Sequence, residues 1–228
     1  MDVRLQTDFI DYYDHWFDLD GLIFNRYSVM GIDRPAMFSF FSNNGIPTPT
    51  FGIVKNISLQ NFIQKTNNIF LVIYLDHKAH QGKNKIKVSF QEAYVNYKNF
   101  FFSEFLPPVN FPAVATSYRF LKVGSRSFWL SYSSQNWRSN YGDVRIKLFN
   151  KSDLFNFKIQ TTTSIEKIKE ILLKTPYPLL AVDFILFNNV LYAVDFNISP
   201  QVKGTGVEKI LPAKEVVNLI KVFLKKNI

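Results

Sequence analysis

Two apolar segments, 180–187 and 190–197, flank the dipeptide Asn188-Asn189, and this arrangement constrains the fold of the chain more than any other feature. Each segment is long enough for a full β-strand. Asparagine tolerates the left-handed backbone that a tight two-residue turn requires. The stretch therefore predicts a β-hairpin.

Three side chains with oxygen donors, Asp183, Asp195 and Asn197, interrupt these apolar runs. Strand side chains alternate between the two faces of a sheet, so Asp195 and Asn197 share one face. One interpretation is a solvated hairpin whose polar residues point outward. The other is a metal site, because an unpaired charge within an apolar run is costly and carboxylate-led oxygen ligands suit Mg²⁺ that bridges nucleotide phosphates.

The amino-acid composition limits which kinds of protein this chain can be and which kinds of functional site it can contain. With 47% hydrophobic and 17% aromatic residues, a chain of 228 residues folds around a substantial core. The lack of cysteine excludes disulfides, thiolate nucleophiles and cysteine-ligated metals. No apolar run is long enough to cross a membrane and the N-terminus is acidic, so we expect neither a span nor a signal peptide, and a cytoplasmic location.

The formal net charge of +9 favours a polyanionic partner: nucleotide phosphates, nucleic acid or an acidic peptide. Many of the aromatic residues lie in apolar runs such as 100–102, where core packing explains them better than base stacking. Nucleic acid is therefore not expected as a partner, and neither is a membrane.

Helical and extended patterns alternate along the chain. Ser58 and Ser164 precede two amphipathic patterns as helix caps, and Pro35 suits the first turn of another helix. Expected helices cover 34–44, 59–65, 165–174 and 214–226. Expected strands cover 51–54, 70–75, 86–90, 100–106, 118–123 and 127–133, with a basic loop at 77–85. Interleaved elements of this kind predict an α+β fold of sheets backed by helices.

Five segments, in order, resemble the ATP-grasp ligases, most closely the group that includes the ribosomal-protein glutamate ligases. They are 31–54, 71–88, 100–106, 118–140 and the hairpin that contains Asp183 and Asp195, and together they span about residues 20 to 225. The resemblance implies two α+β subdomains that clasp a nucleotide. The small subdomain would cover 31–106 and the C-terminal subdomain 107–228. Residues 1–30 would be a short remnant or linker where the family has a whole preceding domain, absent or much reduced here.

The same resemblance implies ATP and Mg²⁺ as cofactors. It also implies an ATP-dependent carboxylate–amine (or carboxylate–thiol) ligation through an acyl phosphate, with a peptide or an amino acid as the expected substrate. Asp183, Asp195 and Asn197 would hold the metal. Catalytic contacts with phosphate and the acyl-phosphate oxyanion would come from Arg119, Arg138 and Asn140. Nucleotide contacts would come from Arg34, Tyr74, Lys78, Gln81, Gly82, Glu104, Phe105 and Leu106.

Several positions depart from the family pattern. Tyr74 stands where the family has a phosphate-binding lysine, and we expect Lys78, Lys83 or Lys85 of the basic loop to be the alternatives for that charge. Asp195 replaces a glutamate. A second copy of the chain or a partner subunit could replace the missing front domain. The alternative function is thus a catalytically impaired ATP-grasp protein that serves as a nucleotide-binding partner subunit.

Overall fold

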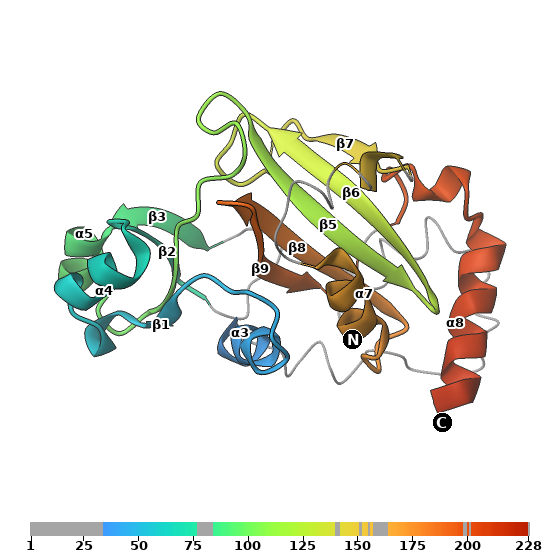
Figure 1. Ribbon diagram of the computed structural model, residues 1–228, viewed down its shortest axis with the longest axis horizontal. Helices are drawn as coiled ribbons and strands as arrows, with labels where there is room; N and C mark the ends of the chain where they lie inside the picture. The colour runs from blue at the N-terminus through green and yellow to red at the C-terminus, as the bar shows by residue number, and fades with distance from the viewer. Residues whose placement is uncertain are drawn as a thin grey trace.

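Two antiparallel sheets, each covered by helices, make up the described part of the chain (Figure 1). The structure is a computed structural model and describes residues 34–76, 84–139, 142–150, 152–154, 156, 164–197, 200 and 202–227. The smaller sheet uses strands between residues 51 and 104, and the larger one uses strands between 115 and 197. No helix in these ranges is long and apolar enough to cross a membrane.

The smaller sheet has the strand order β1-β4-β2-β3. Its alternate residues face opposite ways: Leu71 and Ile73 pack under helices, whereas Val72 and Tyr74 face the larger sheet. Ser58 caps one of the covering helices, as expected, by accepting the Asn61 N–H at 3.2 Å. The elements are β1 (Phe51–Ile53), η2 (Val54–Asn56), α4 (Leu59–Thr66), β2 (Phe70–Tyr74), β3 (Lys85–Ser89), α5 (Phe90–Asn96) and β4 (Phe101–Glu104).

The larger sheet has the order β7-β6-β5-β8-β9, with every pair antiparallel. The expected hairpin is confirmed, because Asn188 and Asn189 have φ values of 47° and 58° and join β8 to β9. A second tight turn, at Gly124, joins β5 to β6. The strands are β5 (Ala115–Val123), β6 (Arg126–Ser134), β7 (Arg145–Leu148), β8 (Leu179–Phe187) and β9 (Val190–Asn197).

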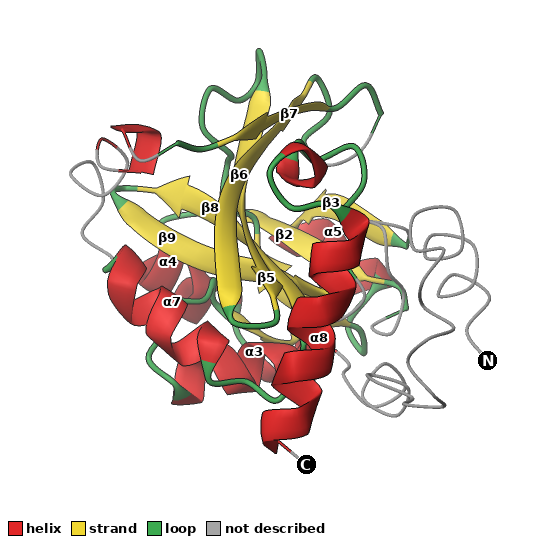
Figure 2. Cartoon of the chain, turned by 90° about the vertical axis from the view of Figure 1, so that its right-hand side faces the viewer, coloured by secondary structure: helices red, strands yellow, loops and turns green. Residues whose placement is uncertain are grey.

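Helices cover both faces of the larger sheet, and Figure 2 shows α7 and α8 on opposite sides of it. Along β8, Leu180 and Val182 pack with α7 (Ile165–Leu173) and α3 (Arg34–Asn43), whereas Leu179 and Ala181 pack with α8 (Ala213–Asn227). The short helix η3 (Val207–Lys209) precedes α8. Ser164 caps α7 by accepting the Lys167 N–H, which confirms that boundary.

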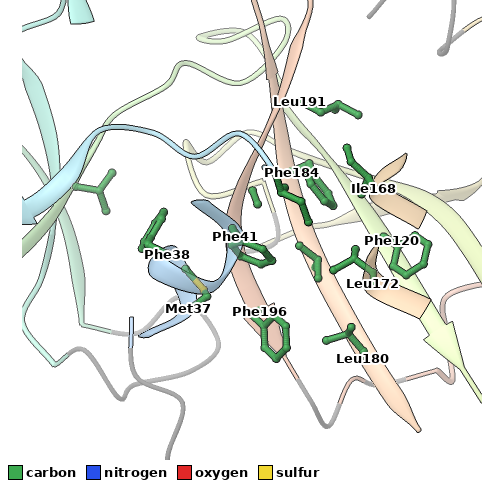
Figure 3. Close-up of a cluster of buried hydrophobic side chains, with 14 of the residues drawn as sticks. Met37, Phe38, Phe41, Phe120, Ile168, Leu172, Leu180, Phe184, Leu191 and Phe196 are labelled. Atoms are coloured by element: carbon green, nitrogen blue, oxygen red, sulfur yellow. The ribbon is translucent and has the colours of Figure 1, made fainter. Parts of the chain in front are cut away.

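Helix α3 connects the two sheets through one apolar cluster (Figure 3). Phe38 stacks on Phe51 of the smaller sheet with ring centroids 5.1 Å apart, and Phe41 contacts Phe196 of the larger sheet at 5.8 Å. Phe38 and Phe41 are fully buried. Burial of this kind, worth about 1.5–3 kcal/mol per large apolar side chain, fixes the smaller sheet against the larger one.

Three local features differ from the sequence expectations. Phe90 begins helix α5 rather than ending a strand, because the Ser89 hydroxyl caps the helix by accepting the Glu92 N–H. Lys85 lies in strand β3, paired with Tyr74, and not in the basic loop. Strand β7 was not expected; it is a short and mostly exposed edge strand beside β6.

Candidate functional site

A pocket opens between the two sheets. It contains about 640 Å³ of space, part of which is the open mouth of the pocket. One wall comes from strands of the smaller sheet, the other from strands of the larger sheet and the loop after β6. The lining residues are Val72, Tyr74, Lys85, Ser103, Glu104, Phe105, Leu106, Pro108, Ser117, Trp137, Arg138, Ser139, Asp183, Ile185, Val194 and Asp195.

Two carboxylates face each other at one corner of this pocket. Asp183 on β8 lies directly opposite Asp195 on β9, and a bulge follows, because the next pair is Phe184 with Ala193. Directly opposed residues project from the same face of a sheet, where like charges destabilise the pair. The corner therefore needs positive charge.

Two cations bind Asp195 from the other side of the pocket. The Arg34 guanidinium, on the first turn of α3, contacts Asp195 Oδ1, and Lys85 Nζ lies 3.0 Å from Oδ2. Burial would raise the pKa of Asp195, but the charges of Arg34 and Lys85 outweigh it and hold that pKa well below its ordinary value. Burial lowers the pKa of Lys85, and Asp195 offsets this only in part.

Arg119 binds the second carboxylate. It lies opposite Asp183 across the β5–β8 pair, with Nε 2.6 Å from Oδ1 and Nη2 2.8 Å from Oδ2. This two-point contact is the geometry that a guanidinium prefers with a carboxylate. Burial alone would lower the pKa of Arg119, but Asp183 reverses the effect and raises it. Tyr132 also contacts the guanidinium, with its ring centroid 4.4 Å from the Arg119 Cζ.

The segment Glu104–Leu106 forms the opposite end of the pocket, where the chain passes from one sheet to the other. Burial raises the pKa of Glu104, against the opposing effect of the Thr50 N–H that donates to its Oε2 at 3.3 Å. The Phe105 N–H donates to the Phe70 carbonyl, and its own carbonyl accepts the Asn68 side-chain amide. Both backbone groups of Phe105 thus have partners within the protein.

The loop after β6 lines another side of the pocket. Arg138 lines the pocket, and its Nε is 3.4 Å from Asn136 Oδ1, a bond at the long end of the range. Trp137 packs edge-on against Phe105 with centroids 5.9 Å apart. On the side of the smaller sheet, the Tyr74 hydroxyl is 3.1 Å from the Ser103 hydroxyl. Tyr74 is therefore part of the pocket wall.

Most of the described residues expected at the site converge. Tyr74, Glu104, Phe105, Leu106, Arg138, Asp183 and Asp195 line the pocket, and Arg34 and Arg119 contact its carboxylates. Asn197 lies two residues beyond Asp195 on β9, opposite Ala181, and is not among the lining residues. Lys78, Gln81, Gly82 and Asn140 lie outside the described residues.

Trp137 and Lys85 are among the lining residues that sequence reasoning missed or misplaced. Trp137 was not expected there, and Lys85 was expected only as one of three loop lysines rather than as a strand residue. The Lys85-Ile86-Lys87 alternation was a usable signal, because it puts both lysines on one face of a strand. Among the described residues no group of three or more acidic or histidine side chains could hold a metal. The oxygen donors at the corner are a pair of carboxylates, with Asn197 farther along the strand.

Comparison with known proteins identifies the fold. No protein-family model and no curated protein matches the chain. The D-alanine–D-alanine ligase from Bacillus anthracis matches with a TM-score of 0.54 and 11% identity, over 85% of this chain and 68% of the ligase. The ATP-grasp ligase PsnB, complexed with a variant of its minimal precursor, Mg and ADP, matches with a TM-score of 0.56 and 10% identity, over 87% and 61%. A RiPP-associated ATP-grasp ligase from Chryseobacterium gregarium, complexed with ADP and a leader and core peptide, matches with a TM-score of 0.51 and 12% identity, over 84% and 59%.

These similarities show that the chain has the α+β ATP-grasp fold, which confirms the expected fold class. At 10% to 12% identity they show the fold alone. The chain spans between 59% and 68% of the length of these three structures.

Proposed function

We propose that this protein is an ATP-dependent carboxylate–amine ligase that activates a carboxylate as an acyl phosphate, with a peptide or an amino acid as substrate. The observation that carries the proposal is the convergence of Asp183, Asp195, Lys85 and Arg138 in one pocket between the two sheets. Such a pocket, with an apolar end and a charged end, suits a molecule that has an aromatic base and a phosphate chain.

The adenine fits the apolar end. The pocket lining includes the apolar side chains of Val72, Phe105, Leu106 and Ile185 and the Trp137 indole, and flat apolar surfaces of this kind favour an aromatic ring. Because both backbone groups of Phe105 already have partners, we assign the recognition of the adenine edge to the Glu104 carboxyl and the Leu106 backbone. The triphosphate would then extend toward Asp183 and Asp195.

The carboxylate pair, Asp183 and Asp195, suits Mg²⁺ only when the ion arrives bound to phosphate. Its donors are of the type that Mg²⁺ prefers. Among the described residues that pair at this corner, however, Arg34, Lys85 and Arg119 bring three positive charges against the two negative charges of Asp183 and Asp195. A corner with an excess of one positive charge does not attract a lone divalent cation, whereas a nucleotide triphosphate reverses the local sign. We therefore assign Asp183, Asp195 and Asn197 to the binding of Mg²⁺ that arrives with ATP, where the ion would neutralise charge on the transferred phosphoryl group.

The protein side chains act by position and charge. Arg119 is held by Asp183 on one side and by the Tyr132 ring on the other, so its location is fixed before substrate binds. Arg138 lines the same pocket from the loop after β6 and would contact the transferred phosphoryl group or the acyl oxyanion. Fixed donors aimed at developing negative charge lower the barrier of such a reaction without reorganising during it.

A second candidate function is nucleotide binding without turnover. The specific observation in its favour is that Asp195 is already neutralised by Arg34 and Lys85, which compete with a metal for its oxygens. Two predictions apply to either candidate. One is that the subdomains divide at residue 106. The other is that a second copy of the chain or a partner subunit completes the substrate site.

Turnover separates the two candidates. We expect the full chain to release ADP from MgATP when it is supplied with a panel of peptides and amino acids, and Asp195→Asn to release at least about 100-fold less. Glu166→Gln, on an exposed turn of α7, is the matched control for the loss of one acid. Saturable MgATP binding with no ADP release across the panel would favour the non-catalytic candidate.

A further inference from the structure

Lys85 is held less firmly at the charged end of the pocket than Arg34 and Arg119 are. Resting on the proposed function, we propose that Lys85 of strand β3 is the lysine that binds the phosphate chain of the nucleotide. It would act from the strand next to Tyr74, the position at which the family resemblance predicts a lysine and the chain has none.

The position of Lys85 supports this assignment. Lys85 pairs directly with Tyr74 across β2 and β3, so the two side chains leave the same face of the sheet. Its Nζ is 5.4 Å from the Tyr74 ring centroid, and both residues line the pocket. A lysine at position 85 therefore faces the same part of the pocket as a lysine at position 74 would. It does so from β3, which lies one strand farther from β4 than β2 does.

The two arginines have more contacts that hold them in place. Arg119 uses two nitrogens to bind Asp183, and Arg34 is 4% exposed beneath Asp195, with Met37 Sδ 3.5 Å from its Nη1. Lys85 instead bonds one carboxylate oxygen with one of its three N–H donors. An ammonium group on a flexible four-carbon stem can turn to an arriving oxygen, whereas a forked guanidinium in a two-point contact is fixed.

A second consequence concerns Asp195, the residue that Lys85 would leave in order to bind phosphate. In the free protein its ammonium neutralises Asp195 Oδ2 at 3.0 Å. When the ammonium turns to phosphate, that oxygen becomes available to a cation. Lys85 therefore favours phosphate and disfavours a lone divalent metal, and its removal should change the two affinities in opposite directions.

Three probes test this by calorimetry on the full chain: MgATP, tripolyphosphate in the presence of EDTA, and Mn²⁺ alone. For Lys85→Met we expect MgATP and tripolyphosphate to bind about 10- to 100-fold more weakly, as for the loss of a charged hydrogen bond. We expect Mn²⁺ alone to bind at least about threefold more tightly, because one positive charge has left the corner. Lys65→Met, exposed on α4, is the control for net charge.

Two further variants keep the test decisive if Lys85→Met does not fold. Lys85→Arg retains the charge and should keep most of the tripolyphosphate affinity. The exchange Tyr74→Lys/Lys85→Tyr returns a lysine to β2 and should restore MgATP binding to within about tenfold of the wild type.

The outcomes are distinguishable. Opposite changes for tripolyphosphate and Mn²⁺ support the role of Lys85. Equal affinities of wild type and Lys85→Met for MgATP and tripolyphosphate overturn that role and leave the proposed function intact. Absence of any MgATP binding by the wild type overturns both.

Discussion

Arg119 lies directly opposite Asp183 on neighbouring strands, and its guanidinium binds both oxygens of that carboxylate. The side chains are only 13% and 11% exposed, so the pair has lost most of its solvent. A buried ion pair of this kind costs more to break than it contributes as a whole, because the remaining charge loses its main partner. The pair therefore fixes the position of both residues at the candidate site.

Removal of one member of this pair should be strongly destabilising. We expect Arg119→Met to lower the free energy of unfolding by about 3 kcal/mol, because it leaves the Asp183 charge without its main partner. The double variant Arg119→Met/Asp183→Leu should recover most of that loss. Denaturant unfolding of the wild type, the two single variants and the double variant gives the coupling energy, and additive losses would show that the pair makes no such contribution.

The turn between β5 and β6 should tolerate no side chain. Gly124 has φ +57°, and a Cβ there would lie 2.6 Å from the Leu219 carbonyl of α8. Gly204 has φ +79°, and a Cβ there would have nothing within 4 Å. Both alanine variants incur the left-handed strain, so Gly124→Ala should lose about 1–3 kcal/mol more than Gly204→Ala. Equal losses in thermal unfolding would contradict the contact with α8.

Local rules predicted much of the fold. The caps at Ser58 and Ser164 and the turn at Asn188 depend on neighbouring residues only, and each is found where the sequence places it. Helix α5 was missed although Ser89 and Glu92 have the spacing of a helix cap, because the alternating residues before them suggested a continuing strand. Strand β7 was missed because it has only four residues, too few for the alternation of charged and apolar side chains to stand out, and its pairing with β6 makes it a strand.

The site was predictable in its residue types but not in its pairings. Asp183 and Asp195 were recognisable because they interrupt apolar runs. Arg119 and Arg34 were expected at the site, but not as the partners of these carboxylates: Arg119 is 64 residues from Asp183, and Arg34 is 161 residues from Asp195. Such contacts depend on how the two sheets pack, which no local pattern contains. The role of Lys85 depends in addition on the strand register, which places it beside Tyr74.

Stability should depend on pH through Lys122. This residue is fully buried, and its ammonium donates to the Leu173 and Thr175 carbonyls at the end of α7. Burial lowers its pKa from 10.5 to about 8. Between these values the unfolded chain binds more protons than the folded one, so the free energy of unfolding rises with pH. From about pH 8 to 10 the wild type should gain stability relative to Lys122→Met; a constant difference in denaturant unfolding would contradict this.

Tryptophan fluorescence should report on nucleotide binding. Trp137 lines the pocket beside Phe105, whereas Trp129 packs against Phe120 in the core and is 3% exposed. Of these two indoles, a nucleotide in the pocket changes the surroundings of Trp137 alone. In a Trp16→Phe background, which removes the third tryptophan of the chain, MgATP should therefore alter the emission of the parent protein and of Trp129→Phe, but not that of Trp137→Phe. A response that survives in Trp137→Phe would place the nucleotide elsewhere.

The most direct test of a nucleotide site at the Asp183–Asp195 corner is a calorimetric titration of the full chain with MgATP, beside the double variant Asp183→Asn/Asp195→Asn. We expect saturable binding at one site in the wild type and a loss of at least about tenfold in the double variant, because the carboxylates no longer hold the metal that arrives with the phosphates. Equal MgATP affinity in the two proteins, with both folded by circular dichroism, would contradict it.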